Sequence, residues 1–351
     1  MDQIVAVDQI GTASAKQDLL LYEVASVPGA GLTGVLTSLA GEVHGAMAAA
    51  APAAGRWTRD TVVRQLGFGS SDGGRVVGTG TGLWADINYD QGTWKADSVA
   101  SKFDTSRNQF VVGLDGTLLT AGRIGLALTH SQTDVNARAG KGALKETMLL
   151  AYGQGHAGGA TIDALVGYGA TDWNTTRTDP LSADGALAGS ANGNSVLADL
   201  GVHRAFDAGR VVLEPYARFT YQMVSRDRFD EQGTSLAALS AGAYTSVGQE
   251  WSAGLTLRSA VGNPLAAPWT YRLRAGLAYD HGDLLNPTLN MTLAGAALTV
   301  RSPDVGRSGF QAEALVTMRM SERMYAYLGA SGEARSNHNA VDGVLGVRYA
   351  F

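Results

Sequence analysis

The chain ends in a strand-like stretch, Val344 to Phe351, in which apolar side chains alternate with small or polar ones. One face of this stretch carries Leu345, Val347, Tyr349 and Phe351. Successive side chains of a strand point to opposite sides of the sheet, so this terminal strand has one apolar face. A strand at the end of a chain also has an exposed edge that needs a partner. In a closed barrel the first strand supplies that partner, so the ending favours a β-barrel with an apolar outer wall.

The same alternation recurs from about residue 80 onward, in segments separated by turn-rich stretches. We predict twelve strands, at 80–94, 106–119, 123–136, 144–157, 160–174, 194–206, 210–224, 247–260, 269–282, 308–319, 323–335 and 340–351. Each segment is long enough for a tilted strand that crosses a membrane, which needs about 9–11 residues. With an even number of strands, the barrel segment begins and ends on the same side of the membrane, as in bacterial single-chain barrels.

The predicted strand 269–282 shows its two faces most clearly. One face carries Tyr271, Leu273, Ala275, Leu277 and Tyr279, and the other carries Arg272, Arg274 and Asp280. We expect the first face to meet lipid and the second to line the lumen. A water-soluble β-sandwich would also alternate, but its polar face would be outside and its core would need more large residues. We therefore prefer the membrane barrel.

The composition is consistent with this class. Hydrophobic residues make up 45% of the chain, yet it contains no run of 18 or more apolar residues, which a membrane-spanning helix would need. The 46 glycines and 8 prolines suit turns and close strand contacts. With no cysteine, the chain has no disulfide, thiolate metal site or cysteine nucleophile. The net charge of -5 and the lack of a basic run argue against nucleic acid as a partner.

The predicted connections are of two kinds. Those at 121–122, 158–159, 207–209 and 321–322 are short, and those at 177–192, 225–246 and 282–307 are long. Short turns on one rim and long loops on the other are typical of outer-membrane barrels. Aromatic residues near predicted strand ends are expected to form girdles at the membrane interfaces. They are Trp173, Tyr221, Trp251, Trp269, Tyr279, Tyr349 and Phe351.

The segment before the barrel follows a helical pattern. Leu32, Val35, Leu36, Leu39 and Val43 recur at helical spacing, and a run of alanines follows at 46–54. We expect this helix to be interrupted near Pro52 and Gly55. The next piece, 56–66, is rich in arginine and needs a polar site. The lumen can provide one, lined by Asp86, Asp163, Glu214, Arg218, Arg272, Arg274 and Arg348.

Residues 1 to 25 lack the positively charged start and the apolar core of a secretory signal. We therefore expect Met1 to be a start or a cut within a longer precursor. The short stretch 19–24 fits a strand or a helical turn equally well.

Together these pieces resemble the C-terminal translocator domain of autotransporters, the type V secretion family of Gram-negative bacteria. Residues 39–46 (LAGEVHGA) are similar to the family's LSGEAHAS stretch, and residues 56–66 (RWTRDTVVRQL) to its RFVRDAVLDRL stretch. The barrel body adds 109–113, 122–130 and 152–169. Gly346, Tyr349 and Phe351 resemble the family's barrel-assembly signal, although Val344 stands where the family prefers a polar residue. The resemblance covers about residues 30 to 351.

The resemblance implies an all-β membrane protein, a barrel of about twelve antiparallel strands with an N-terminal α-helix threading the lumen. It implies three parts: 1–30 as passenger stub or linker, 31–74 as α-helical linker inside the pore, and 75–351 as the outer-membrane translocator. The implied partners are outer-membrane lipid, the barrel-assembly machinery, periplasmic chaperones and the chain's own N-terminal passenger. We expect a monomer without a cofactor. Some family members cleave between two asparagines on this helix, but residues 32–66 contain no asparagine, so we predict no such cleavage.

Two other functions remain open at this stage. A porin-like channel would use residues 30–66 as a removable plug. A barrel hydrolase would need an Asp-His or Ser-His cluster at the long-loop rim, and His130 and His281 lie near predicted strand ends. No histidine pair has zinc spacing, and we predict no catalytic or metal site. We expect the helix to dock in the lumen through Arg56, Arg59, Arg64, Arg272 and Arg274.

Overall fold

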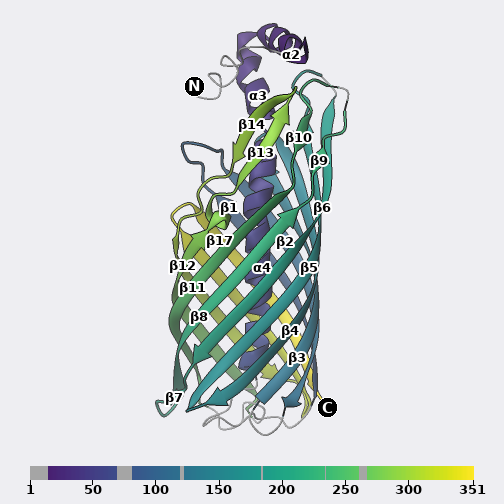
Figure 1. The fold of residues 1–351 in the computed structure, drawn as a ribbon. Coiled ribbons are helices and arrows are strands. Elements are labelled where there is room, and N and C mark those ends of the chain that lie inside the picture. Colours follow the sequence, from purple (N-terminus) through teal and green to yellow (C-terminus); the bar gives the residue numbers. More distant parts are fainter. Residues whose placement is uncertain (1–14, 69–80, 119–121, 183–184, 234, 261–266) are drawn as a thin grey trace.

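The computed structural model describes residues 15–68, 81–118, 122–182, 185–233, 235–260 and 267–351. Three helices come first, α2 (Ala15–Ala25), α3 (Gly29–Leu39) and α4 (Glu42–Gly67). The twelve long strands are β1 (Gly82–Trp94), β2 (Phe103–Leu118), β3 (Gly122–Ala137), β4 (Gly140–Ala157), β5 (Ala160–Thr178), β6 (Ala186–His203), β8 (Val211–Arg226), β11 (Tyr244–Ser259), β12 (Trp269–Gly282), β15 (Ser308–Arg319), β16 (Met324–Arg335) and β17 (His338–Ala350). They form a tall barrel around α4 (Figure 1).

The barrel closes through its first and last strands. β1 pairs with β17 from Gly82↔Ala350 to Trp94↔His338, and every other long strand pairs with its neighbours in sequence order. β8 and β11 complete the circle on the opposite side. The predicted barrel of twelve antiparallel strands is therefore confirmed, and the terminal strand has the partner that its alternation required.

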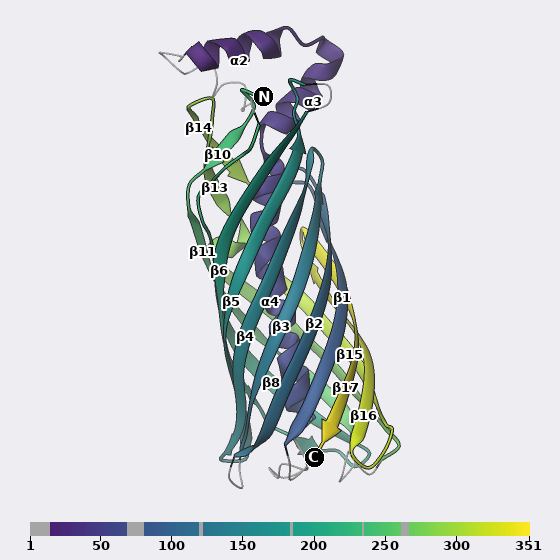
Figure 2. The ribbon, with the colours of Figure 1, turned by 90° about the vertical axis from the view of Figure 1, so that its right-hand side faces the viewer.

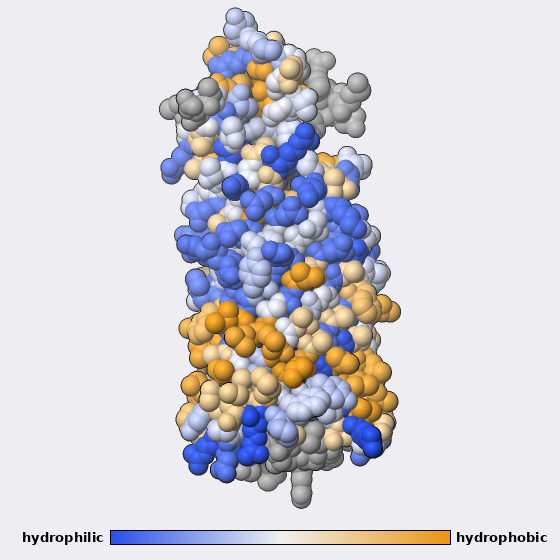
Figure 3. Space-filling model, turned by 180° about the vertical axis from the view of Figure 1, so that it is seen from behind, coloured by the Kyte–Doolittle hydropathy of each residue, from blue (hydrophilic) through white to orange (hydrophobic). Residues whose placement is uncertain are grey.

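The two faces of the strands differ as the alternation predicts. In β1, Leu83 and Ile87 are exposed on the outer wall, whereas Trp84 and Asp86 are buried toward the lumen. Figure 3 shows the outward apolar residues gathered in a belt around the lower part of the barrel, with a polar band above it. Of the aromatic residues expected in girdles, Trp173 is wrongly assigned, because its side chain is buried inside the barrel.

The strands on one side rise well above this belt. β4, β5 and β6 contain 18, 19 and 18 residues, more than the roughly 9–11 that a membrane requires. The predicted long connection at 177–192 is wrong for this reason. Its small, polar residues continue the alternation of β5 and β6 instead of forming a loop, so only 179–185 connect the two strands.

The other two long connections contain strands of their own. The connection between β8 and β11 holds β9 (Phe229–Asp230) and β10 (Leu239–Ala241), and that between β12 and β15 holds the 3₁₀ helix η2 (Asp283–Leu285), β13 (Thr288–Leu293) and β14 (Ala296–Arg301). The four strands form a separate sheet in the order β14-β13-β10-β9, which we call the outer sheet. Figure 1 shows this sheet at the mouth where α2 and α3 emerge. A short strand on the opposite rim, β7 (Phe206–Asp207), pairs with β8.

The helical segment breaks at a different place from the expected one. Gly41 has a left-handed φ of 64° and separates α3 from α4, whereas α4 continues through Pro52 and Gly55. Glycine adopts this conformation without the cost that other residues incur. The chain 19–24, left open between strand and helix, is part of α2. No helix among the described residues is both long and apolar enough to cross a membrane.

Both views place α2 and α3 beyond one mouth and the C-terminus at the opposite rim (Figures 1 and 2). We call the first mouth the outer mouth, because the long connections lie there. The glycine-rich sequence also predicts a flexible hinge at 72–74 and an entry turn to the barrel at 78–82. The hinge and residues 78–80 lie outside the described residues.

Candidate functional site

Helix α4 runs along the lumen and is buried from Val43 to Leu66 except at Arg56, Asp60 and Val63, which are half-buried on one face of its lower half. Its upper half is alanine-rich, and its lower half carries Arg56, Arg59 and Arg64. A helix with this many charges needs counter-charges wherever water is excluded. The inner wall supplies them from several strands, which is possible because each strand points every second side chain inward.

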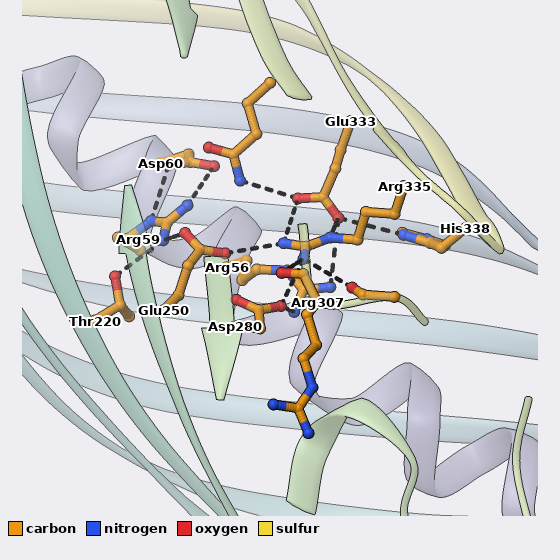
Figure 4. A network of polar contacts seen from close by, with 12 residues as sticks. Arg56, Arg59, Asp60, Thr220, Glu250, Asp280, Arg307, Glu333, Arg335 and His338 are labelled. Atoms are coloured by element: carbon orange, nitrogen blue, oxygen red, sulfur yellow. Dashed lines mark hydrogen bonds and ion pairs between the residues drawn. The ribbon is translucent and has the colours of Figure 1, made fainter. Parts of the chain in front are cut away.

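The best-formed contact belongs to Arg59, which is almost fully buried. Its Nη1 donates to Glu250 Oε1 at 2.5 Å and to Thr220 Oγ1 at 2.9 Å, and its Nε donates to Asp60 Oδ1 at 3.0 Å (Figure 4). Glu250 lies on β11 and Thr220 on β8. The guanidinium therefore ties the helix to two neighbouring strands.

Arg56 lies beside a wall cluster of charges centred on Arg335 (Figure 4). Arg335 forms ion pairs with Glu333 at 2.7 Å, Asp280 at 2.8 Å and Glu250 at 3.3 Å. Arg56 approaches the same carboxylates, Asp280 at 3.9 Å and Glu333 at 3.7 Å. Three acids thus face two arginines, and Glu250 links this cluster to Arg59.

Arg64 and Gln65 hold the lower end of the helix. Arg64 donates to Asn88 Oδ1 at 2.9 Å and to Asp342 Oδ2 at 3.4 Å. Gln65 donates to Asp86 at 3.3 Å and also contacts Tyr327. These partners lie on β1, β16 and β17, so the lower helix contacts the seam where the barrel closes.

Strand β2 makes two further contacts with the helix. Arg107 Nη1 donates to the carbonyl oxygen of Ala54 at 2.8 Å, and Gln109 Nε2 donates to Thr58 Oγ1 at 2.7 Å. Neither residue was predicted to contact the helix. Their inward-facing positions in the predicted strand 106–119 could have identified them as residues that line the lumen.

Arg272 and Arg274, the two wall arginines expected to dock the helix, have their main contacts with other wall residues. Arg272 pairs with Glu313 on the neighbouring strand at 2.6 Å, and its guanidinium packs against Gly67 at the helix end. Arg274 lies over the ring of Tyr216, 4.0 Å from its centroid. The helix arginines face wall acids instead. Opposite charge identifies these partners, because cations on a helix require anions on the surrounding wall.

The top of α4 is held by a buried polar cluster at the outer mouth, which we call the latch: Ser38, His44, Arg177 and Glu231. Glu231 accepts from His44 Nε2 at 2.9 Å and from Arg177 Nη2 at 2.7 Å. Arg177 Nη1 also donates to the carbonyl oxygen of Ser38 at 3.1 Å, and its Nη2 contacts the Ala237 carbonyl oxygen. The latch therefore joins the α3–α4 junction to β5 and to the outer sheet.

Burial and charge act on the two titratable groups of the latch. Burial lowers the pKa of His44, although Glu231 opposes this effect, and the nearby charges of Arg226 and Arg177 lower it further. For Glu231, burial alone would raise the pKa. The hydrogen bonds from His44 and Arg177 and the charge of Arg177 outweigh it and lower the pKa of Glu231 to about 2.

These pKa directions predict that acid opens the latch. Because the folded His44 binds a proton less readily than the unfolded chain, stability contributed by neutral His44 is lost as the pH falls below about 6.5. The contribution of Glu231 is lost at lower pH, from about 4.5 toward 2. We expect amide hydrogen exchange at residues 41–45, corrected for intrinsic rates, to be faster at pH 5.5 than at pH 7.5. His44→Gln should remove the difference, and an unchanged pH dependence in that variant would contradict the assignment.

The residues of the expected assembly signal lie at the C-terminal rim. Tyr349 and Phe351 are exposed on the outer wall with their ring centroids 5.2 Å apart. Gly346 faces the lumen, and the ring of Tyr327 from β16 occupies the space where a side chain would be. Gly346 therefore has a packing role that its place in a terminal motif does not reveal.

The histidines considered for catalysis lie on the outer wall. His130 is exposed with Nδ1 2.9 Å from Thr147 Oγ1, and His281 is exposed at the end of β12. Across the part of the chain that the structure describes, no group of three histidine or acidic side chains could hold a metal ion. Neither histidine forms the Asp-His or Ser-His cluster that the hydrolase alternative requires.

Comparisons with known proteins agree with this architecture. The model of the autotransporter β-domain family matches residues 83–331. An extracellular serine protease of Serratia marcescens is 26% identical over 328 residues, which cover 89% of this chain and 30% of that protein. A second extracellular serine protease of that organism is 27% identical over 330 residues, again 89% of this chain and 30% of that protein. This chain therefore spans about 30% of the length of the curated relatives it matches.

Solved structures share the fold. The translocator domain of the autotransporter NalP from Neisseria meningitidis superposes with a TM-score of 0.67 at 20% identity, covering 84% of this chain and 96% of that one. The β domain of the Bordetella autotransporter BrkA gives 0.55 at 17% identity, covering 78% and 100%. The transport unit of AIDA-I from Escherichia coli gives 0.55 at 13%, covering 77% and 90%.

These matches favour neither the porin nor the hydrolase alternative, since the translocator β-domain is not an enzyme. The family model spans most of the barrel, and the barrel itself has the apolar belt that an outer membrane requires. The chain therefore belongs to the autotransporter β-domain family, whose barrels lie in the Gram-negative outer membrane and mediate secretion of an N-terminal passenger.

Proposed function

We propose that α4 is the resident plug of this translocator, the part of the linker that stays in the lumen once the passenger has reached the cell surface. The observation that carries the proposal is the pairing of the helix arginines with wall acids, above all Arg59 with Glu250 and Arg64 with Asp342. A passing unfolded chain has no fixed charges at these heights, so the contacts form only when 56–64 come to rest there.

In this proposal the three parts have separate roles. Residues 1–30 are the passenger's last stub or a linker, 31–74 the linker that occupies the pore, and 75–351 the translocator. The position of α2 beyond the outer mouth supports the first role, since the passenger would emerge there (Figure 2). Residues 1–14 and 69–74 lie outside the described part of the chain.

Helix docking includes an indirect role for the wall arginines. Arg56, Arg59 and Arg64 bind wall acids directly. Arg272 and Arg274 lie on β12, the strand that also carries Asp280, and offset negative charge there: Arg272 pairs with Glu313, and Arg274 lines the same cavity as Asp60 of the helix.

Assembly would begin at the C-terminal strand. Tyr349 and Phe351 project outward at the rim, where the barrel-assembly machinery could recognise them after periplasmic chaperones deliver the unfolded chain. We propose that the finished barrel acts as a monomer. Without an asparagine pair on α4, we expect release of the passenger, where it occurs, to use another route.

Surface display tests this proposal. An epitope fused before Met1 should become accessible to antibody on intact Gram-negative cells, and residues 42–67 should stay protected from added protease. A matched chain lacking β17 should leave the epitope inside, because the barrel cannot close. A folded barrel that leaves the epitope in the periplasm would refute secretion, and a cleaved α4 would refute the plug.

A further inference from the structure

Two apolar clusters contact α4 at different heights, and they enclose it to different extents. The lower cluster packs on Val62 and Leu66. Its wall members come from β1 to β6 only, and include Trp84, Val111, Met148, Leu165 and Leu197. The lower cluster is therefore a half-ring, and across from it a small separate cluster of Leu315, Tyr327 and Val344 lies on β15 to β17.

The upper cluster surrounds the alanine run Ala46–Ala53, and we call it the collar. Its wall members come from β1 to β8, and include Trp94, Phe103, Val135, Leu144, Trp173 and Val224. Each of these residues lies at or near the end of its strand that points away from the C-terminal rim, so the collar lies near the outer mouth (Figure 1).

The outer sheet completes the collar on the remaining side. Leu239 of β10, Met291 of β13 and Val300 of β14 belong to the same buried cluster as the alanine run. These strands come from the connections β8–β11 and β12–β15, and therefore cover the side that β1 to β8 leave open. The alanine run therefore meets apolar side chains both from β1 to β8 and from the outer sheet.

Packing in the collar is close. A Cβ atom at Gly45 would lie 2.7 Å from the carbonyl oxygen of Arg301. Met47 fills the space that a side chain at Gly142 would need. Close packing of this kind excludes water, because a site must be polar and roomy to hold it.

The charged half of α4 is packed less completely. One polar cavity beside it is lined by Arg56, Asp60, Glu313 and Glu333 among others, and a second, closer to the periplasmic rim, by Asp163, His203, Glu214 and Arg272 among others. Tyr216 and Arg274 line both cavities. The first lies against the wall from β8 to β17, and the second reaches from β8, β11 and β12 to β4, β5 and β6. Polar cavities of this kind admit water and ions.

We propose that the collar, and not the ion-pair network, is the permeability seal of the plugged pore. Apolar constrictions block ions by excluding water, whereas charged walls stay wet. The ion pairs hold the helix at the right height, and the collar closes around its alanines. This inference rests on the proposed role of α4 as a resident plug.

The test is single-channel conductance of the refolded chain 1–351 in planar bilayers. Val135→Thr makes the collar wettable with little change of volume, and Trp94→Ala opens a gap in it. Val111→Thr is the matched control, because Val111 is equally buried but belongs to the half-ring. Glu250→Gln weakens the ion pairs. We expect both collar variants to raise the small-ion conductance at least tenfold above wild type, and Val111→Thr and Glu250→Gln to stay at the wild-type level.

Two further readouts separate the possible failures. Heat-dependent mobility on gels verifies that each barrel is folded, and protease protection of residues 42–67 verifies that the helix is in place. If the collar variants stay closed, or if Glu250→Gln leaks with α4 protected, the collar is not the seal although the plug stands. If wild type conducts as much as a chain starting near Gly74, the plug itself is refuted and the seal with it.

Discussion

Replacing Gly346 with valine is expected to prevent the barrel from closing stably. The ring of Tyr327 lies over Gly346, and its hydroxyl contacts Asp86 and Gln65. A valine side chain would displace the ring, at a cost of about 1–3 kcal/mol for overpacking. The buried Asp86 would lose a donor, which costs about another 1–3 kcal/mol. The sum is about 2–6 kcal/mol at the seam between the first and last strands.

Gly343→Val is the matched control, since it lies on the same strand and no atom lies within 4 Å of its would-be Cβ. Refolding into lipid vesicles, followed by heat-dependent mobility and urea unfolding, measures the effect. We expect Gly343→Val to behave as wild type and Gly346→Val to give little folded barrel. Equal stability of the two variants would show that the Tyr327 contact does not matter for closure.

Replacing Glu231 with leucine is expected to detach the outer sheet from the helix. Glu231 receives hydrogen bonds from Arg177, from His44 and from the backbone N–H of Leu239, and its side chain is fully buried. Leucine would leave the Arg177 guanidinium buried without a counter-charge. Removing one partner of such a pair costs about 3–5 kcal/mol.

Asp230→Asn provides the control. Asp230 is next to Glu231, but its ion pair with Arg228 is exposed and contributes at most about 1 kcal/mol to the free energy of unfolding. Hydrogen exchange of β9, β10 and the α3–α4 junction should accelerate strongly in Glu231→Leu and stay unchanged in Asp230→Asn. The barrel strands near the membrane should exchange as in wild type in both variants. Slow exchange of the outer sheet in Glu231→Leu would mean that apolar packing alone holds it.

The fold could be read from the sequence to an unusual degree, because a membrane barrel enforces strict alternation. Each strand position faces either lipid or the polar lumen, so its residue must be either apolar or compatible with the lumen, as in Leu83 to Asp90 of β1. The prediction fails where the strands leave the membrane. Above the belt both faces meet water or the helix, so β5 and β6 continue through residues that resemble a loop, and Trp173 turns inward into the collar.

On the wall, alternation predicts which residues face inward, Asp86 among them, but not which of them meet the helix. Arg56, Arg59 and Arg64 could be recognised because arginines on a pore helix need partners. Which wall residues serve them depends on register and height, which sequence alone does not fix. Glu250 and Asp280 on β11 and β12, and Glu333 and Asp342 on β16 and β17, lie far from the helix in sequence and surround it only when the barrel closes. The latch is also non-local, since Arg177 on β5 and Glu231 in the β8–β11 connection reach the α3–α4 junction from distant parts of the chain.

Whether α4 closes a formed pore can be measured by comparing the chain 1–351 with one starting near Gly74 in planar bilayers. We expect the chain 1–351 to conduct poorly and removal of the helix to raise the single-channel conductance sharply, because a lumen of twelve strands then stands open. Equally high conductance in both chains would contradict this expectation, and would place the helix outside the lumen.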